Sequence, residues 1–315
     1  MGSDAENKKE ISRRDFIKET AAGSVVVAAS GALAGNARAK ASPGAESEGI
    51  SMETYNTCGE DLEKILILKT YPIAIKMLKN ESEIPKGAIR PKKDRGEHYA
   101  MCQAFAAARR QGITLAMFLE DHWCFEPIIS YGLVPVPQDY LDGFTNSFFI
   151  ADKAAAAKHA REMTRIPQGK YAGMVLGPLK TANYAPDLTM IYCSTAQLRH
   201  LLLSLRYKNG TQVTSTIDPI GSCVHSIVPS LLKGVCAVTV PDPGDFERAG
   251  AQDDEMILTV PAGRLQELMD GIHHFENSNM GFRRFSYAIH TDFQQPPFYE
   301  EYFRKWGLDA PKKSR

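Results

Sequence analysis

Six cysteines have the clearest potential for chemistry in this sequence: Cys58, Cys102, Cys124, Cys193, Cys223 and Cys236. None falls in a CxxC or CxxCH pattern, so the sequence has no signal for c-type haem attachment or for a local thioredoxin or zinc-ribbon motif. If the fold brings Cys102, Cys124, Cys223 and Cys236 together, their soft sulfur atoms could hold an iron–sulfur cluster or, as an alternative, a zinc ion.

Three other interpretations of the cysteines remain open at this stage. An even number of cysteines in an exported protein is compatible with disulfides. Free cysteines also behave as small buried hydrophobic residues. A thiol-dependent enzyme would require one exposed cysteine with a lowered thiolate pKa.

Several polar residues are secondary candidates for a site. His122 and His225 each lie two positions from a cysteine and could join a mixed sulfur and nitrogen site, although a surface or supporting role is the simpler interpretation. Arg248 lies in the segment DPGDFERAGAQDDE, residues 242–255. We interpret that segment as a solvated loop; the alternative is a pocket rim in which Arg248 holds an anionic ligand. His273 and His274 are interpreted as favourable cations near a helix C-terminus.

Common enzyme signatures are absent from the sequence. It contains no GxSxG, Walker A, HExxH or dinucleotide-binding GxGxxG pattern, so the usual hydrolase, nucleotide-triphosphatase and zinc-protease functions lack support. The 37 basic residues balance 37 acidic residues. This balance argues against a charge-driven partner such as nucleic acid. Whether the protein is an enzyme is left undetermined.

The N-terminal residues resemble an export signal. Two arginines in SRRDFIK, residues 12–18, precede an uncharged stretch and the small-residue cleavage pattern ARAKA. This arrangement predicts a twin-arginine signal over residues 1–41, followed by a mobile leader over residues 42–52. Glycines and serines dilute the apolar stretch, so we expect no stable membrane span after cleavage.

The signal bears on the cysteines, because this route moves folded protein. The twin-arginine translocation machinery is therefore an expected partner, and the expected location is periplasmic or otherwise extracytoplasmic. A cofactor that is assembled in the cytoplasm must be inserted before export, which favours a bound cofactor over the other interpretations.

The rest of the chain alternates between helical and strand patterns. Helices are predicted over residues 59–71, 99–112 and 152–165 and over part of 222–234, and strands over residues 71–78, 211–217 and 235–241. Residues 187–205 and 253–272 read as two similar strand-turn-helix units; duplication and coincidence both remain possible. The pattern predicts an α+β fold with a mixed sheet and flanking helices.

Several segments carry a resemblance to a known family: PIAIKML, CQAFAAARRQG, GPLKTANYAPDLTMIY, SCVHSIVP and PDPGDFER. In this order they resemble the domain of unknown function 169 family of bacteria and archaea. The resemblance implies an α+β domain over residues 53–275, and Cys102, Cys124 and Cys223 fall where such sequences tend to carry cysteine. Residues 276–315 would form an aromatic-rich C-terminal extension.

These observations favour an exported redox or cofactor-binding protein that holds an iron–sulfur cluster for electron transfer or sensing. Such a protein would exchange electrons with a redox partner protein. The alternatives are a periplasmic small-ligand binding module with structural cysteines and a thiol-dependent enzyme.

Overall fold

The computed structural model describes residues 50–278, 280–282 and 297–307. The predicted signal at residues 1–41, most of the predicted leader at 42–52 and much of the predicted extension at 276–315 lie outside the described residues. Within the described ranges, no helix combines the length and the apolar character needed to cross a membrane.

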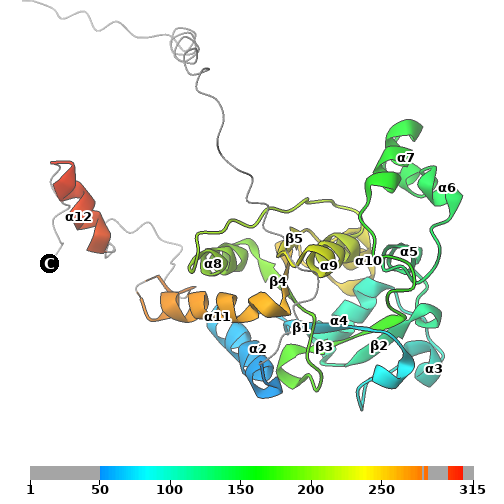
Figure 1. Cartoon of the computed structure of the whole chain (residues 1–315), viewed down its shortest axis with the longest axis horizontal. Coiled ribbons are helices and arrows are strands. Elements are labelled where there is room, and N and C mark those ends of the chain that lie inside the picture. Colours follow the sequence, from blue (N-terminus) through cyan, green and yellow to red (C-terminus); the bar gives the residue numbers. More distant parts are fainter. Residues whose placement is uncertain (1–49, 279, 283–296, 308–315) are drawn as a thin grey trace, which may run out of the picture. The chain divides into compact units, whose positions relative to one another are not determined.

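A six-stranded sheet forms the centre of the domain (Figure 1). Its strands are β1 (Ile73–Leu78), β2 (Leu115–Phe118), β3 (Gly173–Pro178), β4 (Leu188–Ser194), β5 (Ala237–Thr239) and β6 (Glu255–Pro261). They lie in the order β2-β3-β1-β4-β6-β5, and every ladder between neighbours is antiparallel. The expected α+β class is confirmed, but the expected mixed sheet is not: the sheet is antiparallel. Parallel pairing in the described chain is limited to two isolated bridges outside the ladders.

Helices lie on both faces of the sheet. They are α2 (Met52–Leu66), α3 (Pro91–Arg95), α4 (Met101–Gln111), α5 (Phe125–Ser130), α6 (Gln138–Leu141), α7 (Lys153–Glu162), α8 (Thr195–Arg206), α9 (Ser222–Lys233), α10 (Pro243–Ala249), α11 (Ala262–Glu276) and α12 (Pro297–Lys305). Side chains alternate across each strand, so Ile73 and Ile75 of β1 join one core cluster while Ala74 joins the other. The first cluster packs under α4 and α9, and the second under α2, α8 and α11.

The two predicted strand-turn-helix units are present as β4 with α8 and β6 with α11. The two strands pair along their full lengths, from Leu188 opposite Pro261 to Ser194 opposite Glu255. Their helices follow directly and lie side by side on one face of the sheet (Figure 1). The units therefore meet as a pair, while a shared origin stays a prediction.

Residues 211–217 do not form the predicted strand. The side chain of Ser215 takes the place of strand backbone beside β5, because its hydroxyl donates to the Val238 carbonyl at 2.6 Å and accepts from the Val238 amide at 2.9 Å. Side-chain hydrogen bonds of this kind compete with a regular ladder. The β-branched composition of this segment was therefore a misleading signal.

The segment at 242–255 is not the solvated loop that we expected. Its first half forms α10, which begins with Pro243 and is capped by the Asp242 carboxylate. Proline suits the first position of a helix, and aspartate is a favoured N-cap residue. This helix packs against α4 and brings the acidic residues of the segment to the cysteines.

Candidate functional site

Three cysteines lie at the starts of helices on one face of the sheet. Cys102 is the second residue of α4, Cys223 is the second residue of α9, and Cys124 directly precedes α5. The first-turn backbone amides of a helix have no partner within the helix, and the helix dipole places positive potential there. The positions at the starts of α4 and α9 therefore favour sulfur in its anionic form once a ligand compensates for its burial.

The same three thiols share their charged neighbours. Asp242 acts electrostatically on Cys102, Cys124 and Cys223, and the Cys124 thiol also acts on Cys223. Arg248 of α10 interacts with the thiol of Cys102 through a hydrogen bond and with that of Cys124 through its charge. The structure thus brings Cys102, Cys124 and Cys223 into one site, which we call the three-cysteine site.

Burial raises the pKa of all three thiols and so favours their protonated form. It raises the pKa of Cys102 to about 11, with a further contribution from the Asp245 carboxylate. Burial also raises the pKa of Cys124, and it raises that of Cys223 well above the usual range with help from Asp242. A nucleophilic cysteine needs a lowered pKa, and burial acts in the opposite direction on all three thiols.

Two carboxylates of α10 close one side of the three-cysteine site. Asp242 accepts hydrogen bonds from the Ser222 amide at 3.1 Å and the Ser222 hydroxyl at 3.2 Å, and so joins the starts of α9 and α10. The buried Asp245 accepts from the Ser222 hydroxyl at 2.6 Å and from the Tyr192 hydroxyl at 3.0 Å. Burial and the neighbouring Asp242 charge raise the pKa of Asp245.

A buried ion pair between Arg109 and Glu255 lies against the Tyr192 ring. The Arg109 guanidinium donates to both oxygens of Glu255, at 2.7 and 3.1 Å, and its carbon lies 3.9 Å from the centre of the Tyr192 ring. Sequence reasoning missed Asp245, Tyr192 and this ion pair. The pattern DPGD, with aspartates three residues apart around a proline, was a helix-start signal that could have placed Asp245.

The outer side of the site is partly open to solvent. Arg248 lies over the Trp123 ring at 5.1 Å from its centre, and Trp123 is half exposed. The Trp123 indole donates to the Gln103 side chain at 3.1 Å, which fixes the ring beside α4. Arg248 therefore lies beside the cysteines, and its binding of an anionic ligand stays a prediction.

Cys236 does not join the other three. It belongs to the core cluster on the opposite face of the sheet, together with Cys58 and Cys193. There its sulfur lies 3.4 Å from the Arg264 guanidinium. Cys236 directly precedes β5, and its side chain points to the face of the sheet that α11 covers. It therefore lies on the opposite face from the other three cysteines of the predicted ligand set.

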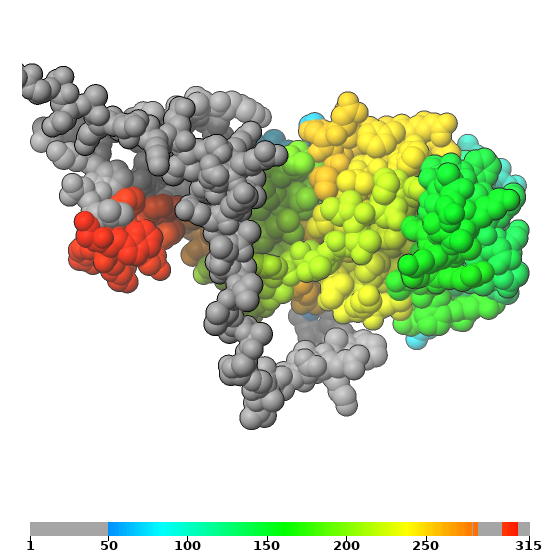
Figure 2. Space-filling model, turned by 90° about the horizontal axis from the view of Figure 1, so that it is seen from above, coloured from blue at the N-terminus to red at the C-terminus, as the bar shows by residue number. Residues whose placement is uncertain are grey.

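The two candidate histidines have charged neighbours other than the three thiols. His122 is buried with neither ring nitrogen hydrogen-bonded, and burial lowers its pKa to about 4. His225 faces Asp218, as does His159 of α7, each with its Nε2 at 3.6 Å from the same carboxylate oxygen. Figure 2 shows the green segment that carries α6 and α7 beside the yellow chain of α9 and α10.

All six cysteines lie within the described residues, and all six are free thiols. In this part of the chain, no three His, Cys, Asp or Glu side chains are grouped closely enough to hold a single metal ion. Such a grouping is what a zinc site would require. The ligands of an iron–sulfur cluster bind different iron atoms and stand farther apart than those of one ion.

Comparison with known proteins places this geometry in a wider context. The family model for domain of unknown function 169, described as uncharacterised ArCR, matches residues 61–271. A similar protein is an uncharacterised protein of Methanocaldococcus jannaschii, 21% identical over 220 residues that cover 68% of this chain and 91% of that protein. No solved structure matches the chain.

Proposed function

This chain belongs to the domain of unknown function 169 family, and we propose that it is an exported redox protein that holds an iron–sulfur cluster at Cys102, Cys124 and Cys223. The observation that carries the proposal is the position of these three cysteines. They come from separate segments of the chain, at the starts of α4, α5 and α9, and they share Asp242 as a charged neighbour.

The surroundings of the thiols suit a group that is bound through sulfur. Soft thiolates favour iron–sulfur clusters over hard ions. Burial disfavours the ionised form of a free thiol, whereas bound iron would supply positive charge and hold the thiolates deprotonated. The three other cysteines lie in the opposite core cluster, so the fourth ligand would be something other than cysteine.

Electron transfer or sensing fits this site better than hydrolysis. Its solvent-facing side is formed by Arg248 and the half-exposed Trp123, which lie beside Cys102 and Cys124. This side is where a redox partner protein or an anionic effector would approach the group. Our proposal places the mature protein outside the cytoplasm, because a cluster assembled in the cytoplasm can leave inside a folded protein that carries a twin-arginine signal.

The test is anaerobic purification of the full chain after expression with iron. We expect a brown protein that contains iron and acid-labile sulfide and whose visible absorption bleaches on reduction. Cys102→Ser, Cys124→Ser and Cys223→Ser should each lower the iron content severalfold. Cys236→Ser is the matched control and should keep wild-type iron.

Other outcomes of this experiment would each contradict the cluster. A colourless protein with one zinc ion that depends on the same cysteines would identify a zinc site, the alternative cofactor. A metal-free protein with all six thiols intact would leave the small-ligand binding module as the better interpretation. Iron that is lost in Cys236→Ser but kept in Cys102→Ser would place the group elsewhere.

A further inference from the structure

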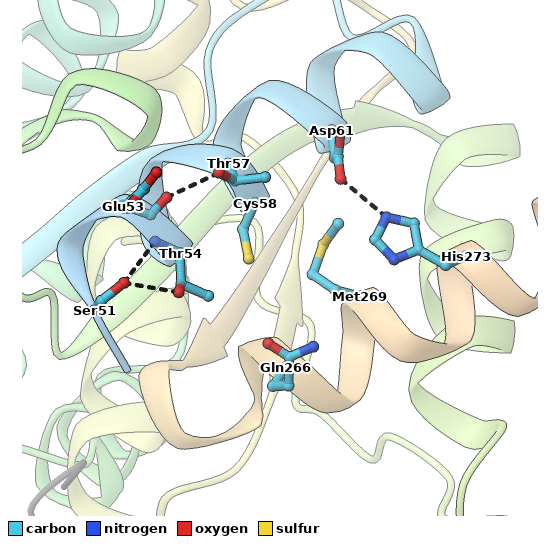
Figure 3. Close-up of a pocket in the computed structure, with 9 residues that line it drawn as sticks. All are labelled: Ser51, Glu53, Thr54, Thr57, Cys58, Asp61, Gln266, Met269 and His273. Carbon is cyan, nitrogen blue, oxygen red and sulfur yellow. Dashed lines mark hydrogen bonds and ion pairs between the residues drawn. The ribbon is translucent and has the colours of Figure 1, made fainter. Parts of the chain in front are cut away.

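A pocket of about 320 Å³ lies between α2 and α11 (Figure 3). These helices cover the face of the sheet opposite α4 and α9, so the pocket is separate from the three-cysteine site. Its lining contains the acidic residues Glu53 and Asp61 and no lysine or arginine. This charge distribution favours a cation.

Two sulfur atoms face the pocket from opposite helices. In Figure 3 the Cys58 thiol of α2 and the Met269 thioether of α11 point into the space between the two helices. Both residues are buried, at 6% and 1% exposure, and both also pack in the core cluster of this face. A thiol and a thioether together are soft ligands of the kind that select Cu(I).

An imidazole stands at the mouth of the same pocket. His273 lies one helical turn after Met269, and its Nε2 lies 3.0 Å from the Asp61 carboxylate (Figure 3). Metal-binding histidines commonly use one nitrogen for the metal and the other for a carboxylate, which sets the tautomer and the ring orientation. Asp61 therefore leaves Nδ1 of His273 available as a ligand. Nearly half of the side chain is exposed, so the ring can turn toward the sulfur atoms.

The charges around Cys58 produce a negative electrostatic potential, which would attract a cation. Burial raises the pKa of its thiol to about 11, and the charges of Asp61 and Asp270 contribute to that shift. The same negative charges that oppose a thiolate would stabilise a positive ion bound beside the sulfur.

We infer that this pocket binds Cu(I) through the Cys58 thiolate, the Met269 thioether and the His273 imidazole. Binding replaces the S–H bond of Cys58 by an S–Cu bond and releases one proton to solvent, with no change in oxidation state. Most protein metal sites use imidazole, thiolate or carboxylate ligands. The Met269 thioether is a softer ligand, which favours Cu(I). Cys58 and His273 lie outside the family match at residues 61–271.

The decisive experiment labels the 11 methionines of the full chain with selenomethionine and adds one equivalent of Cu(I) without oxygen. Copper X-ray absorption should show selenium as a direct neighbour of copper, and Met269→Leu should remove that signal. Met190→Leu, a buried methionine of the other core cluster, is the control and should keep it. Copper bound at the three-cysteine site would have cysteine sulfur, and no selenium, as its neighbour. The selenium signal therefore reports on the pocket between α2 and α11, whether or not the protein holds an iron–sulfur cluster.

A second measurement tests the imidazole. His273→Gln should lower the Cu(I) affinity at least about tenfold in competition with a Cu(I) chelator. His274→Gln is the matched control, because its ring stacks on Tyr207 away from the pocket. Melting temperatures of the copper-free variants check that each is folded. The absence of selenium scattering in the unsubstituted protein, its persistence in Met269→Leu, or equal affinities of the two histidine variants would overturn the inference.

Discussion

At the residue scale, a line of side-chain contacts runs from the sheet to the three-cysteine site. Arg109 binds Glu255, packs against the Tyr192 ring, and so holds the hydroxyl that donates to Asp245. All four residues are buried, and each supplies a polar or charged group that the next one satisfies. Buried charges need such partners. The line therefore fixes the side chain of Asp245 beside the thiols.

We predict that Arg109→Met destabilises the cluster-free protein by about 3–5 kcal/mol, because it leaves Glu255 buried without its main partner. Arg110→Met is the control: its side chain is one-third exposed and lies 3.7 Å from the same carboxylate. It should cost about 1 kcal/mol or less. Urea unfolding of the wild type and both variants measures the free energy of unfolding. Equal decreases in the two variants would contradict the prediction that the buried ion pair contributes more than the exposed arginine.

At the element scale, the two strand-turn-helix units meet through a close approach of their helices. A Cβ atom at Gly271 of α11 would lie 2.2 Å from the Ser204 carbonyl oxygen of α8. No side chain fits there without moving one helix away from the other. The glycine thus sets how closely α8 and α11 pack over β4 and β6.

Replacing this glycine should destabilise the protein even though alanine favours helices. We expect Gly271→Ala to cost about 1–3 kcal/mol through overpacking. Gly263→Ala in the same helix meets nothing within 4 Å and should leave the stability unchanged or raise it by up to about 1 kcal/mol. Thermal and urea unfolding would detect the opposite signs, and a gain in both variants would refute the close-contact argument.

At the scale of the whole molecule, export and cofactor binding are linked in our proposal. The predicted twin-arginine signal lies outside the described residues, so this prediction depends on the sequence alone. The three-cysteine site supplies a reason for such a signal. A cluster inserted in the cytoplasm would be lost from a chain that crossed the membrane unfolded.

Replacing both Arg13 and Arg14 by lysine should keep the protein in the cytoplasm, because this export route reads the arginine pair. Cell fractionation in a bacterial host with the twin-arginine route measures the distribution, and iron content reports on cofactor loading of the retained protein. Arg38→Lys, beyond the arginine pair, should still be exported. Normal export of the double variant would contradict the predicted twin-arginine signal and, with it, the proposed link between cofactor binding and export.

Periodicity and composition alone determined most of the helices and strands of this protein. The alanine-rich segment ending at Gly112 became α4, and residues 71–78 contained β1, because such local patterns depend on neighbouring residues in the chain. Local patterns failed at residues 211–217, where one serine side chain replaced a strand, and at residues 242–255, where a helix start looked like a loop.

From the sequence we proposed Cys102, Cys124, Cys223 and Cys236 as one ligand set, and the family resemblance covered only the first three. The sequence did not show that Cys236 lies on a different face of the sheet from the others. That separation depends on which face of the sheet each segment reaches, and the face is set by long-range pairing and by the alternation of side chains along the strands. The same pairing placed Asp245 and Tyr192 at the thiols and Cys58 opposite Met269. Contacts between distant segments are fixed by the tertiary structure, because the free energy of packing depends on the assembled core and no single segment contains it.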